Sequence, residues 1–376
     1  MNRRKFVLSG AAMAATAKAA DLGSARADFP WAANQTYLNT ATEHPLSVQT
    51  TAAMQEYLQA LTHGPDSARD KFENGELMKE VKRMFARLIN ARPEEIGFTP
   101  STQTGENLVL EGLDIQATGG NVVTNDLHYG GSLHNYESRR NAGMDVRVVK
   151  HRDFQMDMKD LEGVVDRKTK LIAIALVSNV NGYVHEVKAI SDLAHAHGAY
   201  LYCDVIQAAG AVPIDVQAMG IDFLACSAYK FLMGGRFGYL YVREDLQGTA
   251  LKAKLFGGRS TPTGASRYEI STVSHIGCVC QHQALQYIHV IGVNRIRAHA
   301  RPLIDRLRKE LPALGYPTIT PNAESSIASF RLQDPVGTRA RLKQAGVIAS
   351  TGSHLRLSVS VFNNMADVER VVRALS

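Results

Sequence analysis

The chain has 376 residues, of which 45% are hydrophobic and 21% are charged. This composition is that of an ordinary folded protein and excludes a disordered chain. The formal net charge is +6, but residues 1–27 hold five of the basic residues and only one acid, so the remainder carries about +2. So small an excess gives no reason to expect a nucleic-acid partner.

The N-terminus resembles a twin-arginine export signal. The pair Arg3-Arg4 precedes an apolar, alanine-rich run, and Ala25-Arg26-Ala27 fits an A-x-A-like cleavage site. We therefore interpret residues 1–27 as a signal peptide and predict a periplasmic protein. The alternative is a cytoplasmic protein with a basic, alanine-rich leader, because Lys18 and Asp21 interrupt the apolar run.

Short apolar runs then alternate with helical patterns, which is typical of an α/β protein with a parallel sheet. The predicted elements, in chain order, are a strand from 37, helices over 48–61 and 75–89, a strand over 95–99, a helix ending at 112, strands over 121–124, 145–150 and 171–177, a helix over 187–197, and strands over 199–203 and 223–226. A loop over 255–272 leads to helices over 276–291 and 294–311, and a smaller α+β pattern follows, with strands over 329–332, 347–349 and 354–361 and helices over 336–345 and 366–375.

Cysteine and histidine give no metal signal. Only one residue separates Cys278 from Cys280, which is not a zinc-like spacing, and Cys203 and Cys226 lie in apolar runs where we expect core residues. His195 and His197 lie at the end of a predicted helix, and we expect them to cap the C-terminal end of its dipole. No stretch holds about 18 consecutive apolar residues, so no membrane span is expected.

Polar residues follow two of the predicted strands directly. Asp204 comes after the strand over 199–203, and Lys230 comes shortly after the strand over 223–226. Ligands of open α/β sheets bind beyond the carboxyl ends of such strands. A desolvated lysine forms a Schiff base with an aldehyde, and a buried carboxylate keeps a pyridine nitrogen protonated. The pair predicts pyridoxal phosphate, although either residue alone would more often be a loop lysine or a helix N-cap.

Two further strand ends carry candidate ligands. The hydroxyl-rich turn Pro100–Gly105 begins a helix, where free N–H groups suit a phosphate or where a hydroxyl simply caps the helix. His128 and Tyr129 follow the strand over 121–124. An aromatic ring there is suited to stack on a planar cofactor, but either residue fits an ordinary loop equally well.

With these residues in place, the chain resembles the class V aminotransferase family of fold-type I pyridoxal-phosphate enzymes, which includes cysteine desulfurases, kynureninase and isopenicillin N epimerase. The resemblance runs from Tyr37 almost to the C-terminus. It is densest from Val177 to Val242, where a strand-tip Asn, Asp-x-x-Gln and Ser-x-x-Lys follow one another in the family's order. It implies a large domain over 28–291 with a mainly parallel, seven-stranded type of sheet, and a small C-terminal α+β domain over 292–376.

The resemblance also implies roles for the matching residues. Lys230 would form the Schiff base, Asp204 would pair with the pyridinium nitrogen, and His128 would stack on the pyridine ring. The residues expected at the phenolic oxygen are Asn179 and Gln207, and those expected at the phosphate are Thr102, Gln103, Ser227 and Tyr229. Thr272 matches a position that reaches the phosphate of the partner subunit, which implies a homodimer.

Arg356 matches the arginine that receives the substrate carboxylate, a task that suits a bidentate guanidinium. We expect Asn39 to contact the substrate as well. The segment 350–355 reaches Arg356 directly and contains no cysteine, whereas cysteine desulfurases carry their nucleophilic cysteine on a loop there. Persulfide chemistry of that type is therefore not expected.

The sequence thus predicts a pyridoxal-phosphate enzyme of the aminotransferase class V type that acts on an amino acid through Lys230. An epimerase resembling isopenicillin N epimerase, or a carbon–sulfur lyase, is the alternative. A second alternative is a non-catalytic protein that keeps the fold for ligand binding. Because a binding module needs no Schiff-base lysine, the presence of Lys230 together with Asp204 and Arg356 argues against it.

Overall fold

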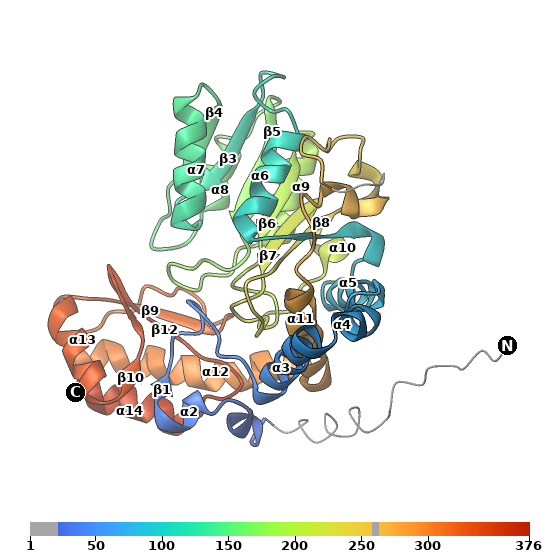
Figure 1. Ribbon diagram of the computed structural model, residues 1–376. Coiled ribbons are helices and arrows are strands. Elements are labelled where there is room, and N and C mark those ends of the chain that lie inside the picture. The colour runs from blue at the N-terminus through green and yellow to red at the C-terminus, as the bar shows by residue number, and fades with distance from the viewer. Residues whose placement is uncertain (1–21, 258–262) are drawn as a thin grey trace.

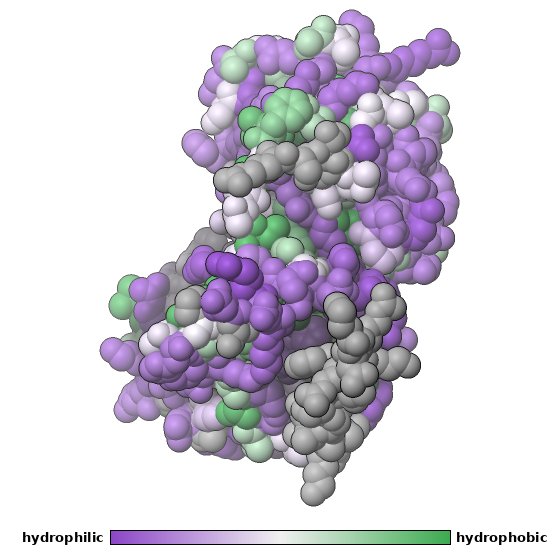
Figure 2. Space-filling view, turned by 45° about the vertical axis from the view of Figure 1, so that its right-hand side comes forward, coloured by the Kyte–Doolittle hydropathy of each residue, from purple (hydrophilic) through white to green (hydrophobic). Residues whose placement is uncertain are grey.

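The computed structural model describes residues 22–257 and 263–376. Residues 1–21 of the predicted signal peptide and five residues of the predicted loop lie outside this range. The described chain forms a large α/β lobe and a smaller lobe (Figure 1). The two lobes meet at a narrower waist, where apolar side chains show on a surface that is otherwise mostly hydrophilic (Figure 2). Within the described range, none of the helices has the length and apolar character needed to cross a membrane.

The large lobe is built on a seven-stranded sheet of the described chain. Its strand order is β2 (Ile96–Thr99), β8 (Gly238–Val242), β7 (Phe223–Ser227), β6 (Tyr200–Asp204), β5 (Thr169–Ala175), β3 (Asn121–Asn125) and β4 (Asp145–Val149). The strands from β7 to β4 pair in parallel, and β8 runs antiparallel to both of its neighbours. The predicted mainly parallel sheet is confirmed.

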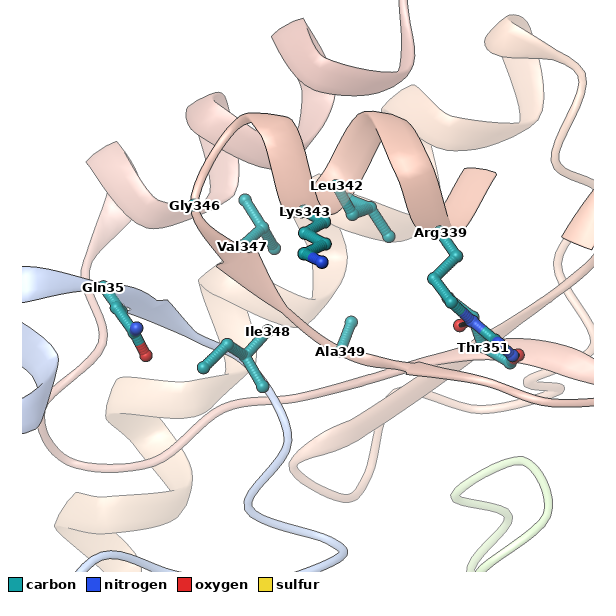
Figure 3. A pocket seen from close by; sticks show the side chains of 9 residues that line it. All are labelled: Gln35, Arg339, Leu342, Lys343, Gly346, Val347, Ile348, Ala349 and Thr351. Atoms are coloured by element: carbon teal, nitrogen blue, oxygen red, sulfur yellow. Dashed lines mark hydrogen bonds between the residues drawn. The ribbon is translucent and has the colours of Figure 1, made fainter. Parts of the chain in front are cut away.

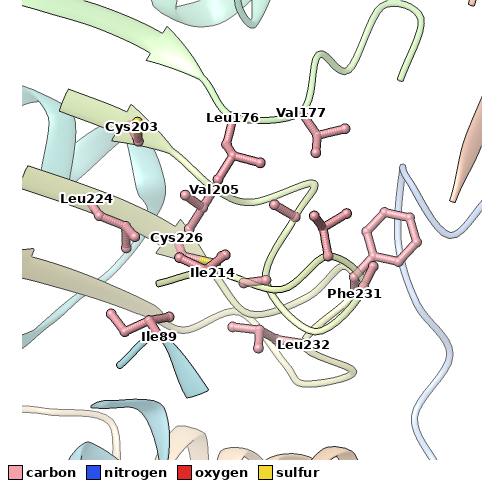
Figure 4. Packing of buried hydrophobic residues seen from close by; sticks show 14 of the residues in the cluster. Ile89, Leu176, Val177, Cys203, Val205, Ile214, Leu224, Cys226, Phe231 and Leu232 are labelled. Atoms are coloured by element: carbon pink, nitrogen blue, oxygen red, sulfur yellow. The ribbon is translucent and has the colours of Figure 1, made fainter. Parts of the chain in front are cut away.

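Helices cover both faces of this sheet, which explains why its central strands are apolar throughout. On one face lie α6 (Thr102–Gly112) and α7 (Gly130–Asn141), which pack against residues such as Tyr202 and Ala225. On the other lie α5 (Glu76–Leu88), α9 (Val187–Ala196), α10 (Val216–Met219) and α11 (His275–Ile291). Cys203 and Cys226 point into this second layer, so their predicted place in the core is confirmed (Figure 4).

The remaining helices of the large lobe are α3 (Val48–His63), α4 (Pro65–Phe72) and α8 (Met158–Glu162). The sequence did not predict α4, α7, α8 or α10. In α7 only Ser132 and Tyr136 are buried, so the helix has no apolar stripe that would reveal its period. Its two leading glycines are also typical of a loop.

The small lobe contains α12 (Val293–Glu310), α13 (Pro335–Gln344), α14 (Met365–Leu375) and the antiparallel sheet β11 (Ser350–Thr351), β12 (His354–Ser358) and β9 (Ile327–Arg331). A further strand, β10 (Val347–Ile348), pairs in parallel with β1 (Thr36–Tyr37) from the start of the chain. The N-terminal segment therefore crosses to the small lobe, whereas the sequence assigned it to the large domain. The predicted strand over 347–349 is divided between β10 and β11.

Part of the predicted signal peptide packs on the folded body. Ala25 is buried, and the Arg26 guanidinium donates to Asp367 Oδ2 at 2.8 Å and to the Phe362 carbonyl at 3.0 Å. Asp28 accepts a hydrogen bond from the Tyr287 hydroxyl at 2.9 Å. Cleavage after residue 27 would remove the Arg26 contacts and leave the buried Asp367 carboxylate without its cation.

We expect Arg26→Ala to lower the free energy of unfolding by about 1–3 kcal/mol, because it leaves a buried carboxylate without its charged donor. The midpoint of urea unfolding measures this loss. Arg373→Ala is the matched control, since Arg373 forms an exposed pair with Glu369 on the same helix as Asp367 and should change stability by less than about 0.5 kcal/mol. Equal midpoints for the two variants would contradict the expected effect.

Candidate functional site

Asp204 and Lys230 lie at the same edge of the large sheet, as predicted. Asp204 is the last residue of β6, Lys230 follows the adjacent β7, and both are buried. Burial lowers the pKa of Lys230 to about 8, although the Asp204 charge opposes this shift. Burial likewise raises the pKa of Asp204 to about 6, against a hydrogen bond from the Ile206 N–H at 2.9 Å and the attraction of Lys230. The amine therefore gains a neutral, nucleophilic form near physiological pH.

His128 is also buried, whereas its neighbour Tyr129 is 45% exposed. The His128 Nδ1 accepts the Tyr129 backbone N–H at 2.7 Å, and burial lowers the pKa of the ring to about 3. The imidazole is therefore neutral and carries its proton on Nε2. Lys230 Nζ lies 6.0 Å from the Tyr129 ring centroid, so both aromatic residues belong to this edge of the sheet.

The predicted phosphate site lies where α6 begins beside the end of β7. The Thr102 N–H and hydroxyl both donate to Ser227 Oγ, at 2.8 and 3.0 Å, and the Ser227 N–H donates to Thr102 Oγ1 at 2.7 Å. Gly105 lets the helix come this close, because a Cβ there would lie 2.7 Å from the Ala225 Cβ. The positive end of the α6 dipole is thus fixed at the strand ends, where it favours an anion.

Two other predicted phosphate ligands lie at the border of this region. Gln103 is exposed, and its side-chain amide donates to the Gly131 carbonyl at 3.1 Å. The Tyr229 ring is half-buried, with its centroid 5.8 Å from Lys230 Nζ. Thr272 is exposed, and its predicted contact with a partner subunit stays a prediction.

Arg356 reaches from β12 of the small lobe to the large lobe. It donates to the Asn179 carbonyl and to the Thr42 hydroxyl, each at 2.8 Å, and Thr42 in turn donates to Asn39 Oδ1 at 2.8 Å. Burial lowers the pKa of the guanidinium. The structure thus joins the two predicted substrate residues through Thr42, which the sequence did not single out.

Several buried polar atoms near these residues have no hydrogen-bond partner in the described chain. They include Asn179 Oδ1, Gln207 Oε1, Arg356 Nε and His128 Nε2. Gln207 uses its amide group to donate to the Ala41 carbonyl at 3.0 Å, which leaves its oxygen free. Buried polar atoms are rarely left unpaired, so these atoms indicate a place for a polar ligand.

One buried acid at this edge was missed by sequence reasoning. Glu106 lies on α6 with its Oε1 at 3.7 Å from His128 Nε2, and it accepts hydrogen bonds from Ser132 and Tyr136, each at 2.7 Å. The available signal was an acid on the apolar face of a predicted helix, directly before Asn107-Leu108-Val109.

A separate cavity of about 260 Å³ lies in the small lobe (Figure 3). It is lined by Gln35, Arg339, Leu342, Lys343, Gly346, Val347, Ile348, Ala349 and Thr351. The lining contains no acid, histidine or cysteine, and none of the predicted site residues. We therefore place the candidate site at the strand ends and not in this cavity.

The histidines near residue 197 have ordinary partners. His195 Nε2 lies 2.8 Å from Asp222 Oδ2, and His197 Nδ1 donates to the Leu193 carbonyl at 3.0 Å, as expected for a helix cap. In the part of the chain that the structure describes, no group of three or more His, Cys, Asp or Glu side chains is arranged to hold a metal ion.

Comparison with known proteins identifies related chains. The sequence model of the aminotransferase class-V family matches residues 36–374. The probable cysteine desulfurase of Methanothermobacter thermautotrophicus is 27% identical over 369 residues, which cover 93% of this chain and 92% of that protein. The uncharacterized aminotransferase YcbU of Bacillus subtilis is 29% identical over 285 residues, or 73% of this chain and 75% of that one. The fold matches a C-DES mutant with glycine covalently linked to its PLP cofactor, with a TM-score of 0.84 at 20% identity, over 93% of this chain and 98% of that chain.

These comparisons identify the cofactor as pyridoxal 5′-phosphate. The residues present fit it. Lys230 would supply an amine for its aldehyde, Asp204 would supply an anion for its pyridine nitrogen, and the start of α6 would supply a positive dipole end for its phosphate. The unpaired Asn179 and Gln207 oxygens remain for its other polar groups.

The depressed pKa of Lys230 predicts how the apoprotein takes up pyridoxal phosphate. Only the neutral amine condenses with an aldehyde, so the rate of uptake should rise with pH around a midpoint near 8 and not near the ordinary lysine value of about 10.4. Asp204→Asn removes the charge that stabilises the ammonium, so its midpoint should move to lower pH. The growth of the cofactor's bound absorption band, followed at each pH, measures both. Asp192→Asn, at an exposed acid, should match the wild type.

Proposed function

The chain belongs to the aminotransferase class-V family and is a pyridoxal-phosphate-dependent enzyme of that family. From this premise we propose that it acts on an amino acid through Lys230. The observation that carries the proposal is the buried amine of Lys230 at the sheet edge, close enough to Asp204 and Arg356 for the charge of each to act on its pKa. A lysine with a pKa near 8 both attacks an aldehyde and accepts a proton near neutral pH.

Pyridoxal phosphate supplies an aldehyde and an electron-withdrawing pyridine ring. The chain's own residues then divide the work. Asp204, ionised above about pH 6, would hold a proton on the pyridine nitrogen, and His128, a neutral imidazole, would be the ring that lies against the pyridine. Lys230 Nζ would serve as the base for the proton of the substrate α-carbon. Thr102 and Ser227, which bond to one another at the start of α6, would hold the phosphate.

Arg356 binds the substrate carboxylate in this proposal. Its Nε is buried and unpaired, while its other nitrogens are held by a carbonyl and a hydroxyl and not by a carboxylate. This guanidinium has no anionic partner in the described chain, and burial lowers its pKa. It can therefore bind a carboxylate through two hydrogen bonds. The Thr42 hydroxyl links Asn39 to Arg356, so in this proposal Asn39 contacts the same substrate.

Persulfide formation on a cysteine is not part of the proposal. All four cysteines of the chain are buried, and burial raises the pKa of each thiol. The nucleophile of a persulfide reaction is an accessible thiolate. The segment from Ser350 to Leu355 contains none. We therefore favour reactions that Lys230 drives by proton transfer, with transamination first.

Carbon–sulfur cleavage or epimerisation is the second candidate. C-DES, whose fold this chain shares with a TM-score of 0.82, is described as a cystine C–S lyase. A lyase of this kind requires a base for the α-proton and no protein thiol, which agrees with a buried Lys230 and four buried cysteines. Epimerisation requires removal of the α-proton and delivery of a proton to the opposite face of the α-carbon.

The first experiment records the absorption spectrum of the loaded protein while L-amino acids, including cystine and cysteine, are added one at a time. We expect one class of amino acid to change the cofactor band, and Lys230→Ala to lose both the covalent band and turnover. A 2-oxo acid with the pyridoxamine form of the cofactor identifies transamination, and release of pyruvate and ammonia identifies elimination. Recovery of the D-amino acid identifies epimerisation. Unchanged ligand binding and no turnover in both wild type and Lys230→Ala would support a non-catalytic binding protein instead.

Arg356→Ala should raise KM for amino acids by roughly 10- to 100-fold, the cost of losing charged hydrogen bonds to a carboxylate. Amines that lack a carboxylate should perturb the cofactor band equally in both proteins. Arg331→Ala is the matched control, because Arg331 is an exposed arginine on the neighbouring strand β9 and should leave KM unchanged. An unchanged KM in Arg356→Ala would remove this residue from the substrate site.

We also propose that the protein works as a homodimer in which Thr272 reaches the partner's cofactor. Support comes from its exposure and from the exposed Leu255 and Phe256 at the start of the same loop, since large apolar side chains on a surface favour contact with another chain. Sedimentation should show a dimer. Thr272→Ala should weaken pyridoxal-phosphate binding without dissociating the dimer. A monomeric protein with full cofactor affinity would contradict the proposal.

A further inference from the structure

The buried carboxyl of Glu106 is not explained by the proposed chemistry. It is 1% exposed and lies in a polar cluster with Ser132, Tyr136 and His128 between the sheet and α6 and α7. No lysine or arginine lies within 4.0 Å of it in the described chain. Arg139, on the neighbouring helix, pairs with Glu111 at 2.9 Å and with Asn107 at 2.8 Å. Burying an acid without a cation is costly, so its place beside the cofactor residues requires a reason.

The hydrogen bonds around Glu106 leave room for one more donor. Ser132 donates to Oε2 and Tyr136 to Oε1, each at 2.7 Å. A carboxylate has about four acceptor positions, so two remain. Burial raises the pKa of Glu106 to about 7, while the bonds from Ser132 and Tyr136 favour the charged form. In its charged form the group can accept a further hydrogen bond.

An unused donor near it is His128. Because Nδ1 accepts the Tyr129 N–H, the neutral ring must carry its proton on Nε2, and this atom is buried without a partner in the described chain. It lies 3.7 Å from Glu106 Oε1, slightly beyond hydrogen-bond distance. Hydrogen bonds at active sites are often long without ligand and shorten when it binds.

We propose that Glu106 is a positioning residue, which accepts the Nε2 proton of His128 in the cofactor-loaded protein and thereby fixes the plane of the imidazole against the pyridine ring. This inference rests on the proposed contact between His128 and the cofactor. Two bonds then hold the ring, one from the Tyr129 backbone at Nδ1 and one to Glu106 at Nε2, so it has no freedom to flip or tilt. Glu106 itself acts only through His128.

The test compares Glu106→Gln with Glu111→Gln, an exposed acid one and a half turns further along the same helix. In Glu106→Gln the dissociation constant for pyridoxal phosphate should rise about fivefold, which corresponds to one ordinary hydrogen bond. The induced circular dichroism of the bound cofactor should fall, because its sign and size depend on a fixed ring environment. The downfield Nε2 proton of His128, identified by its absence in His128→Asn, should move upfield. All three should be unchanged in Glu111→Gln.

If Glu106→Gln keeps the wild-type affinity, dichroism and proton shift, Glu106 is only a structural acid and the inference fails. Should this variant not fold, Ser132→Ala replaces it, because it keeps the carboxylate but frees Oε2. Smaller changes in the same direction would support the inference. The absence of any change would overturn it. A failure of the proposed function is distinguishable, since the wild type and Lys230→Ala would then give the same cofactor spectrum. A proton shift without any cofactor effect would place the bond outside the cofactor site and would also overturn the proposal.

Discussion

The site depends on one constraint, which is that an amine and a carboxylate are both buried at the carboxyl edge of a parallel sheet. Adjacent strands β6 and β7 run in the same direction, so the residues that end them meet. Burial drives each group towards its neutral form, while their mutual attraction opposes this. Both pKa values therefore move towards neutrality, which suits groups that hold or accept a proton near pH 7.

The sheet also explains what the sequence revealed. Asp204 and Ser227 follow apolar runs directly and Lys230 comes three residues later, so the local pattern indicates their position near a strand end. The same holds for the central strands, which are apolar because helices cover both faces. The order of the strands was not predicted, because periodicity carries no information on which strands pair.

Contacts between distant segments were beyond local reasoning. Glu106 and His128 lie on separate elements, and only the packing of α6 beside the strand ends brings them together. Thr42 offered no signal, because a threonine in a polar turn is unremarkable until Arg356 contacts it. The pairing of β1 with β10 joins two strands of two residues each, too short to show any alternation.

That pairing has a consequence for how the protein is made. The Leu38 N–H donates to the Ile348 carbonyl, and the Ser358 N–H donates to the Leu38 carbonyl, so the segment after β1 is held by residues far later in the chain. During synthesis the N-terminal segment must wait for these partners, since contacts of such long sequence separation form late. Arg356 lies on β12, among the same late residues. A nascent chain therefore completes the strand ends that carry Asp204 and Lys230 before Arg356, the proposed carboxylate-binding residue, is synthesised.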